Sequence, residues 1–184
     1  MCRQPGHPDA ITLVRLALPP RSIYVESMSK DLAGSQIADF LVIGYGNPLR
    51  SDDGVGPKVA EAVEALHLPG LVVIACHQLT PELAEAVSEA RAVVFVDAAA
   101  DASTEVQLRQ LEPAADTQLM AHAADPRSLL ALAQQLFGRC PPAWWLTIPV
   151  ENLEFGESLS PRAEEGRELA LAHIQKLHHQ FCTG

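Results

Sequence analysis

Short, unbroken runs of apolar residues recur along the chain from residue 40 onward. Three of these runs lie in the first part of the sequence, at residues 40–43, 71–75 and 92–96. Runs of this length without a polar residue are typical of strands that are buried on both faces of a parallel sheet. The pattern therefore predicts three parallel strands.

The segments between these runs have helical spacing instead. Val59, Val63 and Leu66 fall on one face of a helix between the first two strands. Residues 80–90, which precede the third strand, predict a second helix, with Thr80 as its N-cap and Pro81 at its first position. Strands and helices thus alternate, as they do in βαβ units.

The second half of the chain predicts two more strands and two more helices. The strands are expected at residues 105–109 and 143–149, with a long connection at 112–124 between them. Asp125 is a candidate N-cap for the helix that follows this connection, and Gly138 supplies the left-handed residue that ends it. Long connections of this kind often carry functional residues.

The final helix is predicted to begin after Ser160 and Pro161. Its apolar face consists of residues at helical spacing, namely Ala170, Ile174, Leu177 and Phe181. Glutamates near its start and basic residues near its end suit the helix dipole. On this interpretation His178 and His179 are solvated charges at the end of the helix.

These elements predict an α/β fold. We expect a three-layer αβα sandwich with a mostly parallel sheet of about five strands. Residues 39–184 are predicted to form its single domain. Residues 1–38 lack the alternating strand and helix pattern of the rest and are predicted to be a disordered N-terminal extension. Met1 and Met28 both remain open as the natural start, and removal of residues 1–27 is expected to leave the stability of the domain nearly unchanged.

Charge and cysteine content narrow the function classes. The chain of 184 residues has 13 Lys and Arg against 23 Asp and Glu, a formal net charge of −10, which disfavours a nucleic-acid partner. Its 4 cysteines include no C-x-x-C pair, which fits neither a zinc knuckle nor a disulfide framework. We therefore expect a cytoplasmic monomer with reduced thiols and no membrane association.

Candidate functional residues follow the predicted strands, because ligands of such sheets bind at the carboxyl ends of the strands. Asp52 and Asp53 follow the first strand, Asp97 ends the third, and His122 lies in the long connection. Two converging carboxylates about 4 Å apart repel by roughly 4 kcal/mol at an effective dielectric of 20. Such a site favours a divalent metal ion or a shared proton, and two oxygens with one imidazole nitrogen suit zinc, nickel or manganese.

Structural roles compete with these functional ones. Asp52 or Asp53 could cap the first helix, and a role of this kind is favoured for Asp52. His77, after the second strand, is expected to form a local hydrogen bond. The familiar signatures are absent from the sequence: the glycines fit neither a dinucleotide fingerprint nor a phosphate loop, and there is no H-E-x-x-H or nucleophile elbow.

Three features together resemble the hydrogenase maturation proteases, which process the large subunit of [NiFe]-hydrogenases. They are "GYGNPLRSDDGVG" at residues 44–56, the strand end "VVFVDA" at 93–98, and a later loop histidine just before a helix. The similarity runs from about residue 40 to about residue 175. The resemblance implies that Asp53, Asp97 and His122 are both the metal ligands and the catalytic residues, and it implies no other cofactor.

The resemblance also implies an activity. Members of this family remove a C-terminal extension from the large-subunit precursor once nickel has been inserted. The implied metal is nickel presented by the substrate, and zinc or another divalent ion could replace it in vitro. Water polarised by the ion would attack the scissile carbonyl, and a carboxylate that the metal does not fully engage would take the proton.

The segment "CHQLTPEL" at 76–83 departs from the Gly-Gly-Thr type turn of many members. It looks more like the branch that serves bidirectional, NAD-linked hydrogenases, so the substrate is less well defined than the reaction. Two alternatives also remain open at this stage. One is a nickel-checking chaperone that does not cleave, and the other is an α/β module that binds a small cofactor through residues 44–56.

Overall fold

The computed structural model describes residues 38–100, 104–115 and 125–182. The predicted connection is thus described only in part, and nearly all of the predicted extension lies outside these ranges, so the division at residue 38 stays a prediction. The elements follow one another in this order: β1 (Phe40–Tyr45), η1 (Ser51–Gly54), α1 (Val55–Glu64), β2 (Leu71–Cys76), α2 (Leu83–Glu89), β3 (Val93–Ala99), β4 (Gln107–Leu111), α3 (Pro126–Phe137), β5 (Ala143–Pro149) and α4 (Pro161–Cys182).

The strands form one sheet in the order β2-β1-β3-β5-β4. β2, β1, β3 and β5 are parallel, and β4 runs antiparallel to β5 at the edge. The prediction of a mostly parallel sheet of about five strands is confirmed. β2 lies next to β1 on one edge of that strand, and β3, the next strand in the chain, lies next to β1 on its opposite edge. The topological switch point therefore lies between β1 and β3.

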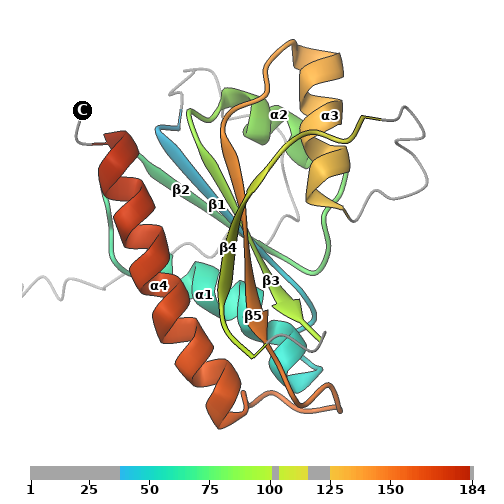
Figure 1. Cartoon of the computed structure of the whole chain (residues 1–184), viewed down its shortest axis with the longest axis vertical. Helices are drawn as coiled ribbons and strands as arrows, with labels where there is room; N and C mark the ends of the chain where they lie inside the picture. The colour runs from blue at the N-terminus through green and yellow to red at the C-terminus, as the bar shows by residue number, and fades with distance from the viewer. Residues whose placement is uncertain (1–37, 101–103, 116–124, 183–184) are drawn as a thin grey trace, which may run out of the picture.

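Helices cover both faces of this sheet, which confirms the three-layer sandwich (Figure 1). α1 and α4 pack on one face, where Val59 and Ile174 join Val42 and Val94 in a buried cluster. α2 and α3 pack on the opposite face in a second buried cluster. The alternation of side chains along β1 and β3 supplies both clusters, as expected of strands that are buried on both faces.

Helix α4 begins where the sequence predicts. Ser160 Oγ accepts a hydrogen bond from Ala163 N at 3.2 Å, as an N-cap does. His178, however, is not a solvated charge: its side chain is buried, and its Nε2 lies 2.9 Å from the Pro69 carbonyl oxygen. The interpretation of His178 was wrong because this residue follows Ile174 by four positions and therefore shares its buried face.

The other helix boundaries match the sequence unevenly. Asp125 caps α3 by accepting from Arg127 N at 3.0 Å, and Gly138 ends that helix at φ 71°, both as predicted. The predicted Thr80 cap was wrong: α2 begins at Leu83, after two hydrogen bonds of the i→i+3 type, and has no side-chain cap. Within the described ranges, no helix is long and apolar enough to cross a membrane.

Candidate active site

The glycines of residues 44–56 bring the chain after β1 back against the strand. A Cβ atom on Gly44 would overlap the carbonyl of Gly56, and one on Gly56 would overlap the carbonyls of Tyr45 and Val96. Gly46 adopts φ 137°, and a Cβ there would overlap the carbonyl of Asp53. Such close approach of backbone to backbone is available only to glycine. The motif therefore packs η1 and the start of α1 directly on the end of β1.

This packing fixes Asp53 at the carboxyl edge of the sheet. Asp53 is half-buried in η1, and its Oδ2 accepts a hydrogen bond from Asn47 N at 3.1 Å. The backbone N–H of Asp53 donates to the Arg50 carbonyl at 3.1 Å, which closes the turn. The side chain is thus held by the same turn that the glycines fold.

Asp97 lies near the carboxyl end of β3, on the face that α2 and α3 cover. Its Oδ2 accepts a hydrogen bond from Tyr45 Oη at 2.8 Å, and the Tyr45 side chain is buried. Burial raises the pKa of Asp97 to about 6; the Tyr45 hydroxyl and the Ala98 backbone act against this rise, and the charge of Asp53 adds to it. Burial and the Asp97 carboxylate together raise the pKa of Tyr45, so its hydroxyl remains a donor.

The charge of Asp53 adds to the rise in the pKa of Asp97, so the Asp97 carboxylate lies within electrostatic reach of Asp53 at this edge of the sheet. A cation bound between the two carboxylates would relieve this repulsion. Such mutual repulsion therefore favours binding of a metal ion. Within the part of the chain that the structure describes, no group of three His, Cys, Asp or Glu residues is arranged to hold a metal ion. His122 lies outside the described residues, so the three-ligand site stays a prediction.

Asp52, next to Asp53, has a different role. Its side chain is fully buried, and its Oδ2 accepts from Glu151 N at 3.1 Å, Asn152 N at 2.9 Å and Ser160 Oγ at 2.8 Å. Its Oδ1 accepts from Ser160 N at 2.6 Å. Burial opposes the charge, but these hydrogen bonds outweigh it and hold the pKa of Asp52 below its usual range. Asp52 therefore fixes the loop between β5 and α4, and the expectation that it caps the first helix was wrong.

Two side chains that act on Asp97, namely Tyr45 and Trp145, were not among the residues identified from the sequence. Tyr45 holds Asp97, and Trp145 on β5 also favours the charged form of Asp97, which lowers its pKa. By distance and angle, the buried Nε1 of Trp145 has no hydrogen-bond partner within the described ranges. The signal for Tyr45 lies in its even spacing from Leu41 and Ile43 along β1, which places all three on the α2 and α3 face.

His77 and Cys76 lie on the β2 side of the glycine turn. They line a small pocket of about 80 Å³ together with Gly46, Lys58 and Glu61. His77 is exposed, and burial raises the pKa of Cys76 to about 11, which disfavours a thiolate nucleophile. A larger cavity of about 360 Å³, lined by Arg91 and Arg139 among others, lies near the amino ends of β3 and β5, away from both aspartates.

No protein-family model matches the sequence, and no curated protein matches it either. Solved structures do match the fold. A [NiFe] hydrogenase maturation protease, HycI, from Thermococcus kodakarensis KOD1 has 19% sequence identity and a TM-score of 0.60, over 76% of this chain and 92% of its own. The hydrogenase maturating endopeptidase HybD from Escherichia coli has 20% identity and a TM-score of 0.59, over 77% of this chain and 92% of its own.

A hydrogenase 2 maturation peptidase from a Thaumarchaeota archaeon gives a similar result. It has 20% identity and a TM-score of 0.58, over 75% of this chain and 96% of its own. The fold of this chain is therefore the fold of the hydrogenase maturation proteases, as the sequence motifs predict. At these identities the likeness extends to the fold alone.

Proposed function

We propose that this chain is an endopeptidase that removes the C-terminal extension of a [NiFe]-hydrogenase large-subunit precursor after nickel insertion. The observation that carries the proposal is an electrostatic one at the carboxyl edge of the sheet, where the charge of Asp53 helps to raise the pKa of Asp97. A fold shared with hydrogenase maturation proteases supports the reaction class. The motif at residues 44–56 supports it independently, because its glycines are what place Asp53 at this edge.

The residues proposed to hold a metal are Asp53, Asp97 and His122. Two carboxylates and one imidazole fit a divalent ion of intermediate softness, such as nickel or zinc. Nickel in this scheme belongs to the substrate, and it supplies Lewis-acid polarisation of water and carbonyl when the precursor is bound. A site with three ligands of mixed type should bind free metal only modestly, so activity would depend on a loaded precursor.

The residues of the chain contribute proton handling and positioning. With a pKa of about 6, Asp97 can accept or release a proton near neutral pH, as a general base requires. Tyr45 donates to one oxygen of this carboxylate and so restricts its rotation. Asn47 N restricts Asp53 in the same way. Two carboxylates held at fixed positions are suited to a substrate that arrives with its own cation.

Cleavage of the precursor tests the proposal directly. The purified chain is incubated with casein, with nickel-free precursor and with nickel-loaded precursor, and parallel samples receive zinc or nickel. Mass spectrometry of the precursor C-terminus is expected to detect cleavage of the nickel-loaded form only. Efficient cleavage of casein or of nickel-free precursor would contradict the proposed dependence on a nickel-loaded precursor, and binding of loaded precursor without cleavage would favour a chaperone.

Single substitutions then test the residues. Asp97→Asn and His122→Ala should each abolish cleavage while the circular dichroism spectrum stays that of the folded chain. Asp39→Asn is the matched control, because this half-exposed carboxylate lies outside the site and forms an ion pair with Arg91. If His122→Ala cleaves at the wild-type rate, the imidazole has no role in the site. Titration with nickel and with nucleotides separates the proposal from a cofactor-binding module.

A further inference from the structure

Two large apolar side chains are exposed close to the candidate site. Phe155, in the loop between β5 and α4, is 89% exposed, and Leu49, in the turn after β1, is 54% exposed. A single exposed apolar residue is common on protein surfaces and needs no explanation. The positions of these two residues relative to each other and to Asp53 are what single them out.

The backbones that carry Leu49 and Phe155 lie side by side. Gly156 N donates to the Leu49 carbonyl at 3.0 Å, and Ser51 N donates to the Gly156 carbonyl at 2.7 Å, so Gly156 pairs with Arg50 as in a parallel strand. Both side chains therefore project from one short stretch of paired backbone. Figure 1 shows the loop after β5 at the same end of the sheet as the turn before α1.

This pairing is reinforced on both sides. Asp52 holds the loop at Asn152 and Ser160, and Ser51 Oγ donates to the Glu154 carbonyl at 3.1 Å. Because the backbone of this loop is already held in place, little conformational entropy of the backbone is lost when a partner covers the exposed apolar side chains. This preorganisation favours binding. Leu49 also lies two residues from Asn47, whose N–H donates to Asp53, so Leu49 belongs to the turn that holds Asp53.

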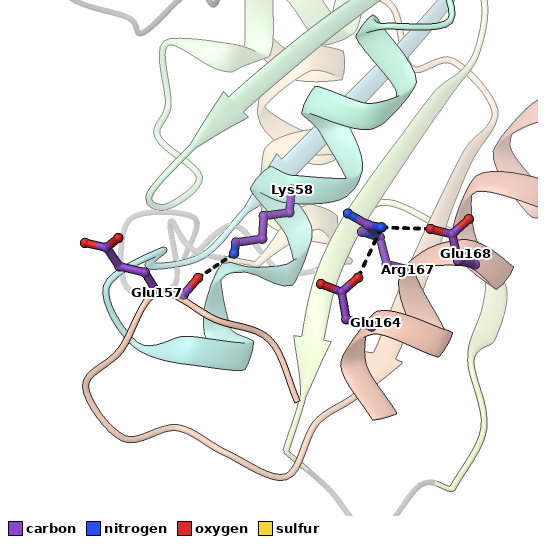
Figure 2. Close-up of polar contacts among 5 residues, drawn as sticks. All are labelled: Lys58, Glu157, Glu164, Arg167 and Glu168. Carbon is purple, nitrogen blue, oxygen red and sulfur yellow. Dashed lines mark hydrogen bonds and ion pairs between the residues drawn. The ribbon is translucent and has the colours of Figure 1, made fainter. Parts of the chain in front are cut away.

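The loop is acidic as well as apolar. Residues 150–160 include Glu151, Glu154 and Glu157 and no basic residue, so these three glutamates outnumber Arg50, the exposed basic residue that pairs with Gly156. All three side chains are exposed, and none forms an ion pair within the described ranges. Lys58 binds the main-chain oxygen of Glu157 at 2.5 Å, and Figure 2 shows the Glu157 carboxylate pointing away from it. Figure 2 also shows Arg167 occupied by Glu164 and Glu168 on α4.

We propose that Leu49, Phe155 and these three glutamates form a docking surface for the substrate protein. Its occupant is an extended segment of the precursor that carries an apolar side chain flanked by Lys or Arg. The apolar side chain covers Leu49 and Phe155, and the basic side chains lie opposite the glutamates. This inference rests on the proposed function for the identity of the partner, but the chemistry of the surface can be tested without cleavage.

The first experiment uses synthetic peptides and measures binding by chemical-shift changes of the loop amides. One peptide carries Leu between two Arg residues, a second has Glu in place of Arg, and a third has Ser in place of Leu. Only the first is expected to shift the amides of residues 150–160, with an affinity that falls as salt is added. Equal binding of all three peptides, or none by the first, would overturn the proposal.

The second experiment compares two double variants in precursor cleavage. Leu49→Ala with Phe155→Ala should raise KM about tenfold and leave kcat nearly unchanged, because docking contacts are equal in ground and transition states. Leu136→Ala with Phe137→Ala is the matched control, since these side chains are 62% and 44% exposed at the end of α3. An unchanged KM in the first variant would overturn the proposal.

The two experiments also separate failure of the docking surface from failure of the proposed function. If the wild-type chain cleaves no precursor, the function fails, and the peptide titration still decides whether the surface binds basic apolar segments. Sedimentation of the wild type and of the Leu49 and Phe155 double variant tests self-association. A wild-type dimer that this variant abolishes would assign the surface to a second copy of the chain and overturn the proposal.

Discussion

Asp52 offers a sharp test of how this domain is held together, because one buried carboxylate joins η1 to a loop about a hundred residues later in the sequence. Replacement by Asn preserves the shape of the side chain and removes its charge. The Asn oxygen can occupy the position of Oδ2 and keep the bonds from Glu151, Asn152 and the Ser160 hydroxyl. The new amide group then faces Ser160 N, which now donates to Oδ1.

The expected loss follows from these contacts. Three hydrogen bonds lose their charge assistance, which costs roughly 0.5–1 kcal/mol each. The buried N–H of Ser160 loses its acceptor, at a further cost of about 1–3 kcal/mol. The sum is about 2.5–6 kcal/mol, a large part of the roughly 5–15 kcal/mol by which small domains are stable.

Urea unfolding at pH 7 measures this difference, and the same measurement at lower pH checks its cause. The hydrogen bonds lower the pKa of Asp52 in the folded state, so their contribution is present above the unfolded pKa of about 3.9 and is lost as the pH falls below it. The wild type should therefore begin to lose its advantage over Asp52→Asn below about pH 5 and lose it progressively as the pH falls towards the folded pKa. Asp39→Asn, at an exposed ion pair with Arg91, should cost less than about 1 kcal/mol.

A difference below about 1 kcal/mol at pH 7 would refute the inference that Asp52 holds the loop. A larger difference that persists unchanged at pH 3 would show instead that shape, and not charge, is responsible.

Two further substitutions test the glycine motif and the candidate base. Gly56→Ala should destabilise the domain by about 3 kcal/mol in urea, because its Cβ would overlap two backbone carbonyls, whereas Gly138→Ala faces open space and should cost only about 1–2 kcal/mol from its positive φ. The pKa of Asp97 in the folded state is raised to about 6. The stability that this carboxyl group contributes below its unfolded pKa is therefore lost as the pH rises through the folded pKa. In the presence of a chelator, Asp97→Asn should therefore be more stable than the wild type by about 2 kcal/mol at pH 8 and equal to it at pH 4, and equal stability at both values would contradict the raised pKa.

The strands and most helix boundaries could be predicted because their signals are local. The unbroken runs at β1 and β3 have no polar residue that would fit an exposed face, and the Asp125 cap with Gly138 at the other end of α3 depends only on nearby residues. The glycine motif and the end of β3 likewise indicate Asp53 and Asp97, since both positions follow from the connection of strands to loops.

The sequence could not predict features that depend on distant residues. The groups that donate to Asp52 follow β5, seven elements after η1 in the chain, so a helix cap was the nearest local explanation. His178 was misread because the composition of a helix end outweighed its spacing from Ile174. Tyr45 was missed because only the pairing of β1 with β3 brings its hydroxyl to Asp97.

The order of the strands has a consequence for the durability of the site. β1 and β3, which carry the glycine turn and Asp97, are both paired on two sides, whereas β2 and β4 are the outermost strands of the sheet among the described residues. Edge strands open in local fluctuations that leave the centre of a sheet intact. Amide hydrogens of residues 41–44 and 93–96 should therefore exchange only through global unfolding, while those of β2 and β4 exchange earlier. The two aspartates would then keep their mutual position for as long as the domain remains folded, even while its margins open and close.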